Sequence, residues 1–202
     1  MAVSDRIEGD AALLAQHGAR NALALVQSIY RRTLAAGGPA EDMIDHFGGR
    51  LDALTRAARS GERIDLEEVI RGELRDFMFG EDPRITIEGP DTLLRSALAQ
   101  PLGLAFHELV TNSLKFGALS SERHDSRLSI AWWIADGEVT IDWVESGVAI
   151  VRSAPARIGF GHEYLTDGLA FQVGAPSILD LQAGRLHWRI RLPTTSILME
   201  ES

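Results

Sequence analysis

The segment from His107 to Gly117 reads HELVTNSLKFG and combines an acid, an amide and a cation. Glu108, Asn112 and Lys115 are four and three residues apart, so a helix places them on one face. The amide oxygen of Asn112 can ligate Mg²⁺, Glu108 can hold a metal-bound water or act as a base, and Lys115 can neutralise phosphate charge. This pattern predicts a Mg-ATP site. A solvated polar stripe on an amphipathic helix is the alternative that the spacing alone favours.

Two later segments strengthen the nucleotide interpretation. Glu145 and Gly147 lie at the end of an expected strand, where a carboxylate can accept a hydrogen bond from an adenine amino group and a glycine lets the backbone approach the base. Gly159 and Gly161 precede an expected helix, and glycines there can cradle phosphates with backbone N–H groups. The loop between the two segments is expected to close over ATP as a lid.

His17 is the candidate phosphoacceptor. On a helical wheel with about 100° per residue, Asn21, Ala24 and Ser28 lie near it, and the apolar side chains gather on the opposite side. An exposed imidazole with little steric cover is nucleophilic at neutral pH, and Asn21 can orient it one turn away. A merely solvated surface histidine is the alternative.

Two helices must carry His17. Residues 7–36 are rich in Ala, Leu and Arg and end at Gly37-Gly38-Pro39, and residues 40–59 then resume an apolar spacing of three and four. A short Gly-Pro turn between two helices predicts an antiparallel hairpin. We therefore expect a first domain over residues 1–61 and a second over 62–202.

The second domain is expected to alternate between helices and strands. Asp65 is a good N-cap for a helix that carries acids in its first turn, and Asp136-Gly137 is a hairpin turn signal. This arrangement predicts an α+β sandwich with helices on one face of a sheet built from antiparallel hairpins. The expected strands are 84–88, 128–134, 138–143, 177–181 and 186–192, the expected helices are 97–116 and 163–173, and 146–160 is an expected loop.

Composition excludes several classes of function. The 202 residues carry a net charge of −9, which argues against a nucleic-acid surface. Cysteine is absent, so the chain has neither a disulfide framework nor a cysteine-based zinc site. No apolar run is long enough for a transmembrane helix, and the acidic N-terminus lacks the apolar core of a signal peptide. We expect a cytoplasmic protein without nucleic-acid or membrane partners.

These motifs resemble the HWE subgroup of sensor histidine kinases, within the GHKL ATPase superfamily. The subgroup is named for a histidine in its N-box and a Trp-x-Glu in its G1 box, which match His107 and Trp143-Val144-Glu145. The resemblance runs in order over residues 14–193. It includes HELVTNSLKFGALS for the N-box, HGARNALALVQSI for the phosphoacceptor box, DHFGGRLDALTRA for the second helix of the dimerisation module, and RIGFGHEYL with LHWRIRLP for the G2 box and last strand.

The resemblance implies a helical hairpin that dimerises, followed by a Bergerat-type ATPase sandwich. It further implies that His17 is phosphorylated from ATP and that a response-regulator aspartate then takes the phosphoryl group. Glu108 and Asn112 would serve the metal and catalysis, Lys115 the phosphates and Glu145 the adenine. Gly147, Gly159 and Gly161 would shape the pocket. The role of His107 stays open: it can be a core histidine, a histidine that supports the ligand residues, or a ligand itself.

The chain departs from the family pattern at two positions. Gly18 follows His17 where the family has a charged residue, and Val148 replaces the second glycine of the G1 turn. His17 also lies so near the start that no sensor domain precedes it, so we expect a fragment of a longer kinase or input from a partner. These features keep open the alternative of a histidine phosphotransfer protein without kinase activity, or of a non-catalytic scaffold.

Overall fold

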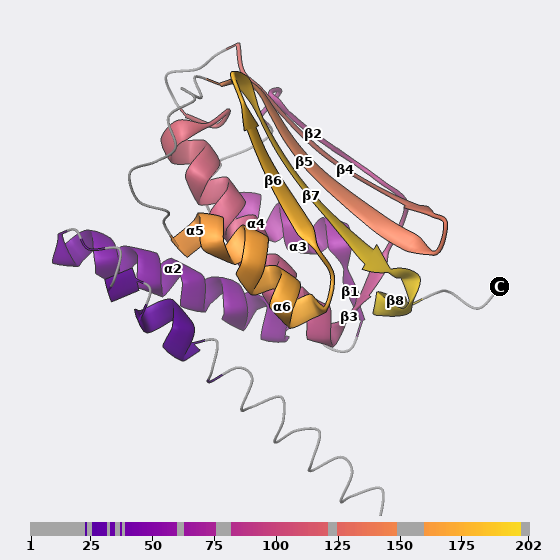
Figure 1. Cartoon of the computed structure of the whole chain (residues 1–202), viewed down its shortest axis with the longest axis horizontal. Helices are drawn as coiled ribbons and strands as arrows, with labels where there is room; N and C mark the ends of the chain where they lie inside the picture. The colour runs from indigo at the N-terminus through magenta and orange to yellow at the C-terminus, as the bar shows by residue number, and fades with distance from the viewer. Residues whose placement is uncertain are drawn as a thin grey trace, which may run out of the picture. The chain divides into compact units, whose positions relative to one another are not determined.

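A computed structural model describes residues 23, 26–31, 33–34, 37, 39–59, 63–75, 82–120, 125–148 and 160–198 (Figure 1). The chain divides into two compact units, Met1–Leu51 and Asp52–Ser202, so the border lies inside helix α2 (Ala40–Arg59). The domain boundary after residue 61 stays a prediction. None of the described helices is long and apolar enough to cross a membrane.

In the first unit, residues 26–31 and 33–34 are helical, and α2 begins at Ala40 as predicted. Two contacts connect these helices: Arg50 Nη1 donates to Thr33 Oγ1 over 2.9 Å, and the rings of Tyr30 and Phe47 meet edge-on at 5.9 Å. Their antiparallel pairing stays a prediction.

The second unit is a mixed α+β fold. Its five-stranded sheet has the order β2-β4-β5-β7-β6, and a small sheet has the order β1-β3-β8. The strands are β1 (Arg63–Asp65), β2 (Ile85–Glu88), β3 (Leu93–Arg95), β4 (Arg127–Ala135), β5 (Glu138–Val148), β6 (Ser177–Gln182), β7 (Gly184–Pro193) and β8 (Ile197–Leu198). The helices are α3 (Leu66–Arg75), α4 (Ser96–Phe116), α5 (Phe160–Glu163), the π-helical turn η1 (Tyr164–Gly168), α6 (Leu169–Val173) and the 3-10 turn η2 (Thr194–Ser196).

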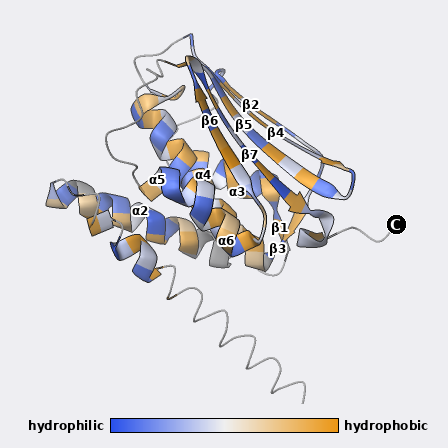
Figure 2. Ribbon diagram, viewed as in Figure 1, coloured by the Kyte–Doolittle hydropathy of each residue, from blue (hydrophilic) through white to orange (hydrophobic). Residues whose placement is uncertain are grey.

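Local signals explain several of these elements. Asp65 caps α3, because its Oδ1 accepts the backbone N–H of Glu67 at 2.7 Å. The β4–β5 hairpin turns at Asp136 and Gly137, whose φ angles of 53° and 78° are those of a type I′ turn. Hydrophobic and hydrophilic residues alternate along the long strands (Figure 2), as a sheet with one buried face requires.

The core lies between α4 and one face of the large sheet. Residues 101–110 of α4 are all buried, which makes it the central helix of the unit. Phe106 packs edge-on against Trp188 of β7, with ring centroids 6.2 Å apart. Tyr164 of η1 donates its hydroxyl to the Pro101 carbonyl at 3.0 Å, which ties the α5–α6 segment to α4. Figure 1 shows α4 and α6 on the same side of the sheet.

The structure differs from the sequence expectations in four respects. β2 pairs with β4 in parallel, so the sheet is not built from antiparallel hairpins alone. The small β1-β3-β8 sheet was not expected, because strands of two or three residues are too short to show an alternating pattern. The helical segment expected at 163–173 begins at Phe160, and β5 continues to Val148 inside the expected loop.

Candidate functional site

Helix α4 presents the predicted polar stripe near its C-terminal end. Glu108 is buried, Asn112 is half-buried and Lys115 is exposed, so the three side chains follow the helix from the core to the surface. The neighbouring Leu109 is buried on another face, as expected from the spacing. The alternative interpretation of this spacing was a solvated polar stripe, but the stripe is not uniformly solvated.

Gly161 is the second element of the site. A Cβ atom added to it would lie 2.7 Å from Glu108 Oε2 and 3.1 Å from Asn112 Nδ2. Any side chain at residue 161 would thus press against Glu108 and Asn112, the two candidate metal-site residues. The start of α5 and the polar face of α4 therefore lie together, although about fifty residues separate them in the sequence.

Glu145 lies inside the fold, with 1% of its surface exposed. Its Oε1 accepts the indole N–H of Trp143 at 2.9 Å, and its Oε2 accepts the backbone N–H of Ala118 at 2.7 Å. Burial raises the pKa of this carboxyl above its ordinary value, against the lowering effect of these hydrogen bonds. Glu145 thus joins β5 to the residue that follows α4, and Trp143 of the same strand holds the other oxygen of its carboxyl.

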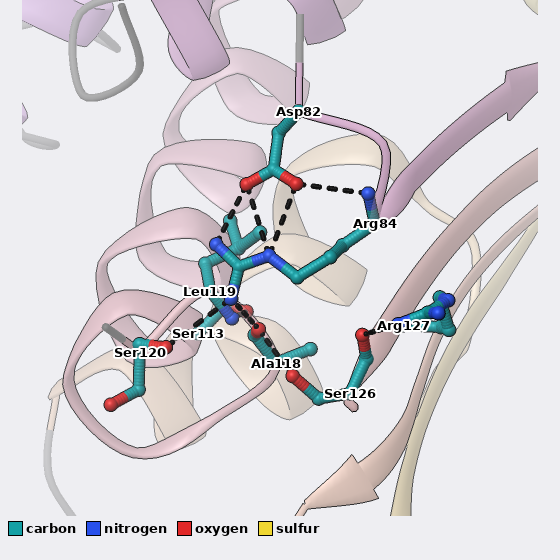
Figure 3. A network of polar contacts seen from close by, with 8 residues as sticks. All are labelled: Asp82, Arg84, Ser113, Ala118, Leu119, Ser120, Ser126 and Arg127. Carbon is teal, nitrogen blue, oxygen red and sulfur yellow. Dashed lines mark hydrogen bonds and ion pairs between the residues drawn. The ribbon is translucent and has the colours of Figure 1, made fainter. Parts of the chain in front are cut away.

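Gly117 makes that junction possible. A Cβ there would overlap Glu145 Oε2 and lie 2.8 Å from Ser113 Cα. The turn that follows, Gly117–Ser120, is held by further side chains that the sequence did not single out (Figure 3). They are Arg84, Ser113 and Ser126, whose hydrogen bonds to the turn have no local signature in the sequence.

Gly147 lies at a β-bulge between Ser146 and Val148. Its φ of +71° is strained for other residues, and a Cβ would lie 3.1 Å from Ser126 Cα and 3.2 Å from the Asp125 carbonyl oxygen. Glycine is therefore required here by the backbone itself. Val148 is buried and continues the β5–β7 pairing opposite Gly184.

His107 contacts a residue of α3. Its Nδ1 is 3.1 Å from Glu73 Oε2, and the two side chains are 5% and 2% exposed. Since Glu108 lies about 100° further round α4, His107 and Glu108 face different neighbours. His107 thus joins α4 to α3.

Three predicted site residues lie outside the described residues. They are His17, Asn21 and Gly159. Among the residues that the structure describes, no group of three His, Asp or Glu side chains could hold a metal ion.

Comparisons with known proteins agree with this architecture. Residues 15–91 match the family model described as HWE histidine kinase. Blue-light-activated histidine kinase 1 of Erythrobacter litoralis is 30% identical over 188 residues, covering 88% of this chain and 51% of that protein. The chain thus spans about half the length of this curated relative.

Solved structures show the same fold. A blue-light activated histidine kinase of Erythrobacter litoralis aligns with a TM-score of 0.61 and 17% identity, covering 86% of this chain and 59% of that one. A histidine kinase domain from the same source aligns with a TM-score of 0.55 and 14% identity, covering 84% of this chain and 96% of that one. These findings confirm the resemblance to the HWE-type histidine kinase core that the sequence motifs predicted.

Proposed function

We propose that this chain is the ATP-dependent core of a protein histidine kinase in a two-component system. The observation that carries the proposal is the close approach of Gly161 to Glu108 and Asn112, which joins two separate nucleotide motifs in one site. The match of residues 15–91 to HWE histidine kinases and the similarity to proteins named histidine kinases support it. The second unit would be a Bergerat-type ATPase sandwich.

The residues around Gly161 suit a Mg-nucleotide. Gly161 packs closely against the side chains of Asn112 and Glu108, an amide and a carboxyl whose oxygens are the hard donors that Mg²⁺ prefers. Asn112 would ligate the metal, and Glu108 would hold a metal-bound water or act as a base. A bound Mg²⁺ would neutralise charge on the phosphates.

The remaining site residues would bind the rest of ATP. Lys115, exposed at the end of the polar stripe, would contact the phosphates. Glu145 would accept the adenine amino group in addition to the hydrogen bonds that it already accepts from Trp143 and Ala118. Gly147, Gly159 and Gly161 would shape the pocket walls.

The phosphoryl group would pass from ATP to His17. A ring nitrogen of the neutral imidazole would attack the γ-phosphorus, the bond from that phosphorus to the bridging oxygen would break, and ADP would leave with the electron pair. The attacking imidazole would release its remaining ring proton to water, and Asn21 would orient the ring. A response-regulator aspartate would then accept the phosphoryl group from His17.

The partners are proposed on the same basis. Exposed apolar side chains in the first unit support a homodimer through the helical hairpin, because Ile44 is 68% exposed and Tyr30 is 53% exposed. A cytoplasmic location would suit contact with a response regulator. A phosphotransfer protein without kinase activity is less well supported, because the similar proteins are named as kinases.

Labelling with γ-phosphate-labelled ATP and Mg²⁺ tests the proposal. We expect acid-labile, alkali-stable label on the wild-type chain, and none on His17→Ala or Asn112→Ala. His46→Ala is the matched control, since it removes another histidine of the first unit and should keep the label. Full labelling of His17→Ala would contradict the assignment of the phosphoacceptor. An unlabelled wild type that accepts label from a phosphorylated regulator would favour the phosphotransfer alternative.

A further inference from the structure

The turn Gly117–Ser120 ends the helix that carries the proposed metal and phosphate ligands. The last carbonyl groups of a helix have no partner within the helix, so the final turn frays unless other groups hold it. The last helical turn of α4 carries Lys115, and Asn112 lies about one helical turn before it. Whatever holds the turn after α4 therefore also holds these two side chains in place.

Arg84 holds this turn from a distant part of the chain (Figure 3). Its Nη1 donates to the carbonyl oxygens of Ala118, at 3.1 Å, and Ser120, at 3.3 Å. Ser126 Oγ donates to the same Ala118 carbonyl at 2.6 Å. A cationic guanidinium beside the carbonyl end of α4 also interacts favourably with the helix dipole.

Asp82 fixes the guanidinium in this orientation. Its Oδ2 accepts Arg84 Nη2 at 2.7 Å, and its Oδ1 accepts Arg84 Nε at 3.0 Å. The two side chains are only 13% and 18% exposed, and the Arg84 hydrogen bond holds the pKa of the Asp82 carboxyl below its ordinary value. The backbone is fixed as well, because the Arg84 carbonyl accepts the N–H of Leu128 in β4.

We infer that Arg84 is a positioning residue of the nucleotide site. It acts through the turn Gly117–Ser120 and sets where Lys115 and Asn112 stand at the end of α4, without itself touching the nucleotide. This inference rests on the proposed function. A lysine cannot replace Arg84, because lysine has a single ammonium nitrogen. That nitrogen cannot donate to both Asp82 oxygens and also to the two turn carbonyls in the same fixed geometry.

The test compares Arg84→Lys and Arg84→Ala with Arg71→Ala in the full chain. Arg71 is the matched control, because it also pairs with an acid in the second unit but is exposed and lies on α3. We expect the dissociation constant of Mg-ATP to rise about tenfold in both Arg84 variants, which is about 1.4 kcal/mol, and to stay unchanged in Arg71→Ala. Hydrogen exchange of the amides in Gly117–Ser120 should accelerate in the same two variants only.

Chemical rescue separates positioning from folding. Adding methylguanidinium at millimolar concentration to Arg84→Ala should restore part of the Mg-ATP affinity, whereas the same addition should not raise the affinity of Arg71→Ala. Wild-type affinity in both Arg84 variants would overturn the inference, and so would a loss of affinity that accompanies global unfolding and resists rescue. A wild-type chain that binds no Mg-ATP would instead overturn the proposed function, while the exchange data still report whether Arg84 holds the turn.

Discussion

Replacement of Gly117 by alanine tests the junction between α4 and β5. The new Cβ would overlap Glu145 Oε2 and lie 2.8 Å from Ser113 Cα, so either the carboxylate or the turn must move. The φ of Gly117 is −107°, which alanine adopts without strain, so the cost comes from the contact alone.

The magnitude follows from three terms. Overpacking costs about 1–3 kcal/mol. Loss of the hydrogen bond from the buried Ala118 N–H to Glu145 costs about 1–3 kcal/mol more if no partner replaces it. The lower entropy of the unfolded alanine chain offsets about 0.4–1 kcal/mol. We therefore expect the free energy of unfolding to fall by roughly 2–5 kcal/mol.

Urea and thermal unfolding measure this change. In a unit of about 150 residues, a loss of this size lowers the melting temperature by roughly 4–20 °C. Gly72→Ala is the matched control, because nothing lies within 4 Å of a Cβ there. Gly72 lies inside α3, so this substitution should stabilise the protein by about 0.5–1 kcal/mol.

A double-mutant cycle identifies the contact responsible. If the overlap with the Glu145 side chain causes the loss, Gly117→Ala should cost less in a Glu145→Ser background than in the wild type. Equal costs in the two backgrounds, or a Gly117→Ala variant as stable as the wild type, would refute the reasoning. The comparison also tests whether the Trp-x-Glu carboxylate positions the end of α4.

Three further predictions concern the site and its supports. Gly161→Ala should weaken Mg-ATP binding roughly tenfold to a hundredfold in equilibrium titration, because its Cβ would press on Glu108 and Asn112 and overpacking costs about 1–3 kcal/mol. The folded-state pKa of Asp82 is lowered, so its ionised form stabilises the fold above pH 3.8 and that contribution is lost as pH falls further. Acid unfolding should accordingly show that Asp82→Asn costs stability at neutral pH and much less below pH 3.8. His107→Leu should destabilise the protein by roughly 1–3 kcal/mol in urea unfolding, and adding Glu73→Leu should recover part of that loss, because the single change removes the hydrogen bond that joins His107 to the buried Glu73.

Much of the site could be predicted from local patterns. The spacing of Glu108, Asn112 and Lys115 determines a shared face once the segment is helical, since helix geometry is the same in any fold. The Asp136-Gly137 turn was also predictable, because only residues that tolerate positive φ suit it. Such features depend on a few neighbouring residues.

The role of the Trp-x-Glu motif could be predicted only in part. The sequence places Glu145 at the end of a strand beside a glycine, which suits a contact with adenine. It does not reveal that Trp143 and Ala118 already donate to the two carboxylate oxygens. Those hydrogen bonds depend on how α4 ends against β5, which no local period encodes.

The sequence by itself determined the polar face of α4, the glycines that bulges and turns require, and the order of the nucleotide motifs. Only the tertiary structure decided which of these residues meet. It brought Gly161 against Glu108 and Asn112, His107 against Glu73, and Arg84 under the turn after α4. The physical reason is that helical and strand periods act over a few residues, whereas these contacts arise when packing of the apolar faces brings distant segments together.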